Sequence, residues 1–320
     1  MSAALVGQSE ELSGDLVPFI SDADISLVLV KIENVQWEPR REMDMDLEVG
    51  SIRCQVVEVF RGPALNKGDI INLPARRIAD PLIRARNNFD QWNNLPLEKG
   101  RYLLLACRPL RASSDWRALA ARVVESPRSP AVAALRQCVE IEQFRGADET
   151  KREMIEEALQ SPEDLERYYA LDALGRRALA SREMAVEMIR RAIVSTATTP
   201  ESKLELGASL TGSMFFSKGE KVEGSNPAVV ASLARGLVNE PDLKRRLNWA
   251  RYLASCILVE FSPRTEADKE IRLSLIKSVQ DPSGAKVLTA LTELSGVGAY
   301  DEQEIVRQLI EAWRTDGRNN

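Results

Sequence analysis

The sequence predicts an α+β protein with two parts, a small N-terminal β-barrel or β-sandwich and an all-α solenoid of helix pairs. Short runs of Val, Ile and Leu separated by Gly, Pro and Asn, typical of strands, extend over about residues 22–125. Beyond about residue 130 the apolar residues recur with a helical period, and prolines recur about every 40 residues. The predicted domains are an N-terminal extension (1–20), a β domain (21–125), a connector (126–131) and a helical domain (132–320).

The β domain is expected to contain five strands. A loop dense in turn residues, Arg61 to Asp69, joins the second and third strands into a hairpin. Five strands in about 100 residues suit a small barrel or sandwich. The predicted strands span residues 24–35, 49–60, 70–73, 101–107 and 117–125.

Three short stretches of this domain resemble a known family. They are Val57-Glu-Val-Phe-Arg-Gly-Pro63, Gly68-Asp-Ile-Ile-Asn-Leu73 and Leu97-Glu-Lys-Gly-Arg-Tyr-Leu-Leu-Leu105. Over roughly residues 20–110 the chain resembles bacterial domains that share the OB-like barrel of the tissue inhibitors of metalloproteinases. In those inhibitors an N-terminal cysteine chelates the zinc of the protease. Because this chain has no cysteine before Cys54, the resemblance implies the fold and not the inhibitory chemistry.

The helical domain is expected to be a stack of helix pairs. Leu243, Leu247, Ala250, Ala254 and Ile257 share one helical face, and Tyr168, Tyr169 and Trp249 also fall on apolar faces, so we expect all of them in the core.

Four prolines mark the predicted repeat. Pro162, Pro200, Pro241 and Pro282 follow one another at spacings of 38, 41 and 41 residues. Proline is favoured in the first turn of a helix, where its missing N–H costs nothing. About 40 residues per helix pair resembles HEAT or armadillo repeats, so we expect the four helices that these prolines begin to stack side by side. The alternative is an irregular helical bundle with similar helix lengths.

The composition limits the chemistry. The chain has 320 residues, no histidine and a net charge of −5, and 44% of its residues are hydrophobic, as in a soluble globular protein. Without an imidazole, a Ser-His-Asp triad, a Cys-His dyad and any zinc site that needs histidine are excluded. No phosphate-binding glycine loop is present either, and Gly296-Val-Gly298 is expected to be a helix stop. We therefore expect no catalytic residue, no cofactor and no metal.

The four cysteines, Cys54, Cys107, Cys138 and Cys256, contain no Cys-x-x-Cys pair. Cys54 and Cys107 both lie in predicted strands, so they either form a disulfide across the sheet or are buried reduced thiols. The N-terminus lacks the basic and apolar segments of a signal peptide, and no apolar stretch is long enough to span a membrane. A cytoplasmic protein is the default expectation. A mature extracytoplasmic chain, with Ser2-Ala3-Ala4 as the remnant of a cleavage site, is the alternative.

One segment concentrates positive charge. Arg76, Arg77, Arg84 and Arg86 lie in a predicted long connection between strands, followed by Trp92. Arginines with a neighbouring aromatic ring on an OB-like barrel could hold single-stranded nucleic acid. Against this, residues 1–125 contain 16 basic and 18 acidic groups, so the domain has no basic excess. These five residues are therefore expected to contact either a partner or the helical domain.

The predicted function follows from the predicted architecture. Solenoids of helix pairs present long surfaces and are used mostly for protein recognition. We therefore expect a non-enzymatic protein-binding or scaffold protein whose partner is another protein. Two alternatives remain: single-stranded nucleic-acid binding through the OB-like domain and its arginine-rich loop, and a His-independent enzyme that uses carboxylates.

Overall fold

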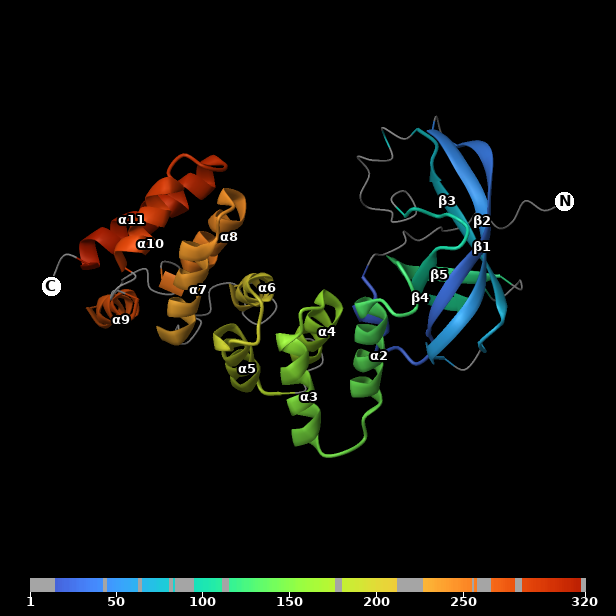
Figure 1. The fold of residues 1–320 in the computed structure, drawn as a ribbon, viewed down its shortest axis with the longest axis horizontal. Coiled ribbons are helices and arrows are strands. Elements are labelled where there is room, and N and C mark those ends of the chain that lie inside the picture. The colour runs from blue at the N-terminus through green and yellow to red at the C-terminus, as the bar shows by residue number, and fades with distance from the viewer. Residues whose placement is uncertain are drawn as a thin grey trace. The chain divides into compact units, whose positions relative to one another are not determined.

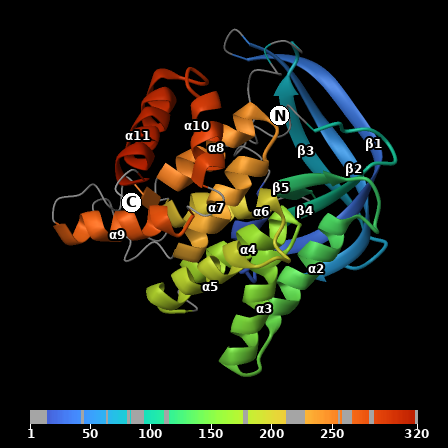
Figure 2. The ribbon, with the colours of Figure 1, turned by 60° about the vertical axis from the view of Figure 1, so that its left-hand side comes forward.

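The structure of the protein is a computed structural model in which the chain divides into two compact units, residues 1–147 and 148–320. The first unit contains an antiparallel sheet and one long helix, and the second contains helices (Figures 1 and 2). The structure describes residues 15–42, 45–62, 65–80, 83, 95–110, 115–175, 180–211, 227–254, 256–257, 266–279 and 284–317.

The five predicted strands are confirmed. They form one antiparallel sheet in the order β3-β2-β1-β4-β5, and β2 and β3 make the predicted hairpin. β1 and β2 are longer than predicted because they continue past Val35 as a paired ribbon whose side chains no longer alternate cleanly between apolar and polar. The strands are β1 (Ser26–Glu42), β2 (Met45–Arg61), β3 (Ile70–Ile78), β4 (Tyr102–Pro109) and β5 (Trp116–Val124).

One face of this sheet forms the main core of the first unit. Residues two apart along a strand point to the same face, so Val28, Val30 and Ile32 of β1 share that face with Ile52 and Cys54 of β2. Leu103, Leu105 and Cys107 of β4 join them in the same buried cluster. The edge strands β3 and β5 also contact each other, although no hydrogen-bonded pairing links them among the described residues. The sheet therefore curves around its core (Figure 2).

The first helix of the chain after the sheet belongs to the first unit. α2 (Pro130–Gln143) contacts β2, and Arg136 of α2 makes an ion pair of 2.9 Å with Glu58. Within the predicted connector, the hydroxyl of Ser129 donates to the carbonyl of Ser126 at 2.8 Å, which makes a closed turn. The division between the compact units thus follows Ala147, whereas the hydrophobic period changes near residue 130.

The end of the predicted N-terminal extension is part of the folded unit. A short 3-10 helix, η1 (Val17–Phe19), lies in a segment whose Leu16 and Ile20 are buried. The guanidinium of Arg61 holds this segment by donating to three of its backbone carbonyls, those of Phe19, Ile20 and Asp22.

The second unit consists of helices that follow one another in pairs (Figure 1). Contacts join α3 with α4, α5 with α6, α7 with α8, and α10 with α11, and α4 also contacts α5. The helices are α3 (Asp148–Gln160), α4 (Asp164–Gly175), α5 (Arg182–Val194), α6 (Pro200–Thr211), α7 (Pro227–Asn239), α8 (Leu243–Ala254), α9 (Glu266–Lys277), α10 (Gly284–Glu293) and α11 (Tyr300–Gly317).

Helices of successive pairs also contact each other in two separate series. One series runs α3, α5, α7 and α10, and the other runs α4, α6, α8 and α11. In the second series the helix starts lie close together, because the Ser202 hydroxyl donates to the carbonyl of Ser161 at 3.2 Å and Arg245 pairs with Glu201 at 2.5 Å. Helices α4, α6 and α8 therefore begin side by side at one end.

The prolines mark helix starts less regularly than predicted. Pro200 is the first residue of α6, but α4 and α8 begin two residues after Pro162 and Pro241. At α8 the cap is Asp242, whose carboxylate accepts from the backbone N–H of Arg245 at 2.8 Å, so the proline lies before the cap. Pro282 lies outside the described residues, and α10, which follows it, packs on α7, while the ion pair Arg246–Glu293 also joins it to α8. The helix that continues the α8 series is α11.

Most of the predicted helical core is confirmed, with two corrections. Leu247, Tyr169 and Trp249 are buried, as expected. Leu243 is 45% exposed because it lies at the first residue of α8, ahead of the buried face, and Tyr168 is also 45% exposed. In the described part of the chain, no helix combines the length and the apolar character needed to cross a membrane.

Candidate functional site

The structure moves two of the predicted site residues from a loop into the sheet. Arg76 and Arg77 lie in β3, which extends to Ile78 because it pairs with the extended part of β2. The guanidinium of Arg77 makes an ion pair of 2.5 Å with Glu48 of β2. It also lies over the indole ring of Trp37 of β1, 4.2 Å from the ring centre. These three side chains form a stacked cluster at one end of the sheet, the Arg77 cluster.

The Arg77 cluster is internally neutralised. Its guanidinium has a carboxylate partner, and its charge lies on the face of the only aromatic ring in the cluster. A base could not stack on that face of Trp37 unless Arg77 moved first. The other predicted site residues, Arg84, Arg86 and Trp92, lie outside the described residues.

Cys54 and Cys107 are buried free thiols, which matches one of the two alternatives left open by the sequence. Burial raises the pKa of each thiol to about 12, and at Cys54 the negative charge of Glu33 adds to this effect. A thiol with such a pKa is protonated at neutral pH, so neither is a ready nucleophile or metal ligand. Among the residues that the structure describes, no group of three or more Cys, Asp or Glu side chains could hold a metal ion.

The clearest carboxyl pKa shifts are downward. A hydrogen bond from Arg307 lowers the pKa of exposed Glu304 to about 2, and a hydrogen bond from Arg245 lowers the pKa of Glu201. A general acid at neutral pH needs the opposite shift, a carboxyl pKa raised by burial or by a second carboxylate. These carboxylates act instead as partners of arginines.

Arginine–carboxylate pairs connect the helices of the second unit. Each joins two different helices, and most of the side chains are partly exposed, so most pairs contribute little individually to stability. Arg167 is the exception, since its side chain is only 3% exposed. The pairs are Arg191–Glu156 (α5–α3), Arg167–Glu205 (α4–α6), Arg245–Glu201 (α8–α6), Arg246–Glu293 (α8–α10) and Arg251–Glu302 (α8–α11).

Two of these arginines share a local motif that the sequence analysis missed. The guanidinium of Arg167 donates to the carbonyl of Ser161 at 2.7 Å, and that of Arg246 donates to the carbonyl of Glu240 at 2.8 Å. In both cases the arginine is six residues after the carbonyl, and a proline directly follows the carbonyl residue. Comparing the segments that begin at Ser161 and Glu240 residue by residue would have revealed this repeated arginine.

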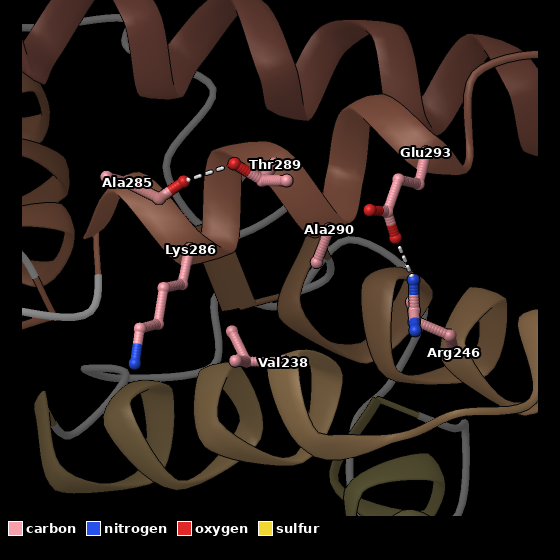
Figure 3. Close-up of a pocket in the computed structure, with 7 residues that line it drawn as sticks. All are labelled: Val238, Arg246, Ala285, Lys286, Thr289, Ala290 and Glu293. Atoms are coloured by element: carbon pink, nitrogen blue, oxygen red, sulfur yellow. Dashed lines mark hydrogen bonds and ion pairs between the residues drawn. The ribbon is translucent and has the colours of Figure 1, made fainter.

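The second unit also contains a shallow pocket of about 390 Å³ between α7, α8 and α10 (Figure 3). Val238 and Ala290 supply apolar surface, and Lys286 extends from α10 toward α7. Arg246 and Glu293 are paired on the opposite side of the pocket. Ala285 and Thr289 complete the lining.

Comparisons of the chain with known proteins give no relative to which a function could be traced. No family model, no curated protein and no solved structure matches it.

Proposed function

We propose that the protein is a non-enzymatic protein-binding or scaffold protein whose helical unit is a solenoid of HEAT-like helix pairs. The observation that supports this most strongly is the pair of contact series, α3-α5-α7-α10 and α4-α6-α8-α11. In an α-solenoid each helix contacts its partner and the equivalent helices of the neighbouring pairs. An irregular bundle has no reason to repeat that pattern through four pairs.

The register of the proposed solenoid includes one insertion. α9 lies between the third pair, α7 and α8, and the fourth pair, α10 and α11, and it contacts both α7 and α11. The fourth pair is therefore displaced by one helix along the chain, which explains why the helix after Pro282 joins the series of α7.

We also propose that the first unit is an OB-like barrel. In such a barrel the first strand pairs with both the second and the fourth, and the third and fifth strands meet to close the sheet. In the observed order, β3-β2-β1-β4-β5, β1 pairs with both β2 and β4. The contact between β3 and β5 lies where the closing pair of such a barrel would be.

Protein binding is favoured over the two other functions by the side chains described above. The nucleic-acid hypothesis needs free arginines and exposed aromatic faces, but Arg77 is paired with Glu48 and covers Trp37. The enzyme hypothesis needs a carboxyl group with a raised pKa, but the shifts of Glu201 and Glu304 are downward. A long repeat surface needs neither feature.

Site-specific photo-crosslinking of the full chain tests this proposal. A benzophenone amino acid replaces Tyr168 or Tyr300, which are exposed on the helical unit, and in a control it replaces Ile70, which is exposed on the sheet. Each variant is irradiated in a lysate of the source organism. We expect both helical positions to yield a covalent adduct with the same protein and position 70 to yield none.

Two outcomes would contradict the proposal. Adducts from position 70 alone would place the binding surface on the first unit. Adducts with nucleic acid in place of protein would favour the single-stranded nucleic-acid alternative.

A further inference from the structure

The pocket between α7, α8 and α10 has the side chains of a carboxylate-binding site. Lys286 lies on its rim and makes no hydrogen bond or ion pair within the described residues. Arg246, whose side chain is only 12% exposed, lies across the pocket from it. Two cationic side chains from two different helices thus line one cavity, at opposite ends of it.

The charges around the pocket do not cancel. Among the described residues that line it, the only carboxylate is that of Glu293, and that group is paired with Nη1 of Arg246. Nε of Arg246 donates to the carbonyl of Glu240 at 2.8 Å, so two of its three nitrogens have partners and Nη2 has none within the described part of the chain. The described lining residues, with one guanidinium, one ammonium and one carboxylate, thus have a net charge of +1.

The rest of the lining limits the shape of the ligand. Val238 and Ala290 lie between the two cations in Figure 3, and Ala285 adds a further methyl group. The hydroxyl of Thr289 donates to the carbonyl of Ala285 at 3.0 Å, so it is occupied within α10. A ligand that matches this lining presents an anionic group to Lys286 at one end of the pocket and a short aliphatic portion to the small apolar side chains beside it.

We propose that this pocket binds an acidic side chain, flanked by small aliphatic residues, on an extended segment of a partner protein. The inference rests on the proposed protein-binding function and specifies the chemistry of the partner. A carboxylate is complementary to the uncompensated charge, and a side chain such as Glu or Asp brings its own short methylene portion. A cavity of about 390 Å³ has room for one such side chain and its neighbours but not for a folded domain.

Peptide titration of the full chain tests the proposal. The probe is acetyl-Ala-Val-Glu-Val-Ala-amide, and acetyl-Ala-Val-Gln-Val-Ala-amide is its uncharged control. We expect the acidic peptide to bind at least about tenfold more tightly at low salt, with the difference shrinking as salt screens the charges. Free glutarate is titrated in parallel, and we expect it to bind more weakly than the acidic peptide because it lacks the flanking aliphatic side chains.

Two variants identify the pocket as the site. Lys286→Gln removes one cation from an exposed position, and Ala285→Leu fills the cavity without changing the charge. We expect Lys286→Gln to weaken binding of the acidic peptide about fivefold and Ala285→Leu to weaken it at least as much. Lys244→Gln, at an exposed lysine of α8 that does not line the pocket, is the matched control and should leave binding unchanged.

The results separate this inference from the proposed function. Four results would each contradict the proposal that the pocket binds an acidic side chain. They are equal affinity for the Glu and Gln peptides, no binding of either peptide, tighter binding of glutarate than of the acidic peptide, and an unchanged affinity in Lys286→Gln. Photo-crosslinking from Tyr168 and Tyr300 would then still show whether the helical unit binds a protein elsewhere. Adducts from position 70 alone would instead overturn the proposed function.

Discussion

The ion pair between Arg167 of α4 and Glu205 of α6 gives the sharpest prediction about stability. The guanidinium of Arg167 donates to one oxygen of Glu205 through Nε at 2.8 Å and also through Nη2. Its Nη1 donates to the carbonyl of Ser161 at 2.7 Å. Because the Arg167 side chain is 3% exposed, water cannot freely replace a lost partner.

Glu205→Gln removes the negative charge while keeping the shape of the side chain. Removing one partner of a fully buried pair costs about 3–5 kcal/mol. The Glu205 side chain is 33% exposed and Arg167 keeps its bond to Ser161, so water and that carbonyl offset part of the loss. We therefore expect the free energy of unfolding of the helical unit to fall by about 2–3 kcal/mol.

Urea unfolding of the full chain, followed by helical circular dichroism, measures this loss. Glu304→Gln is the matched control, because Glu304 pairs with Arg307 on the exposed surface of α11, and it should cost much less than Glu205→Gln. The double variant Arg167→Met, Glu205→Leu removes both charges and should recover much of the stability. If Glu205→Gln cost no more than Glu304→Gln, the side-by-side packing of α4 and α6 would be refuted.

Three further predictions concern the packing and the boundary of the helical unit. Gly236→Ala would place a methyl group about 2.5 Å from the indole ring of Trp249 in α8, so it should lower the free energy of unfolding by about 1–3 kcal/mol. Gly207→Ala would place its methyl group 3.5 Å from the ring of Tyr252, an ordinary contact distance, so it should raise the free energy of unfolding by about 0.5–1 kcal/mol in the same urea unfolding experiment. Glu201→Gln should lower the free energy of unfolding by about 0.5 kcal/mol at pH 7, because Arg245 lowers the folded-state pKa of the Glu201 carboxyl below its ordinary value of 4.5. Urea unfolding at a series of pH values should show this difference from wild type disappearing as the pH falls through the folded-state pKa. Brief trypsin treatment, read by mass spectrometry, should cut in the segment 144–147 before it cuts in the hydrogen-bonded turn at the start of α2.

The sequence predicted the elements of the fold better than their ends. Five strands were recognisable because alternating apolar residues are separated by turn residues. The ends of β1 and β2 were not, since the segment from Trp37 to Arg41 is mostly polar and is a strand only because the two strands pair there. Similarly, α2 has the periodicity of the helical part, yet it packs on β2. Such choices depend on partners distant in the sequence.

The candidate site shows the same limit. Arg76 and Arg77 were predicted in a loop because Pro74 and the following polar residues end the apolar alternation. Their place in β3 depends on Glu48 and its neighbours in β2, which no local pattern indicates. The proline spacing predicted a succession of helices, which the structure has, but it could not indicate that α9 lies between the third and fourth pairs of the proposed solenoid.

The central claim, that successive helix pairs stack in one direction, is tested most directly by distances between spin labels. Labels at cysteines replacing exposed Pro162, Pro200 and Pro241 lie at the starts of α4, α6 and α8, and the buried native thiols should react slowly with the reagent. Packed helices lie about 8–10 Å apart, so the stack predicts about 10 Å between 162 and 200 and about 20 Å between 162 and 241, measured by electron paramagnetic resonance. A distance from 162 to 241 no longer than that from 162 to 200 would contradict the stack.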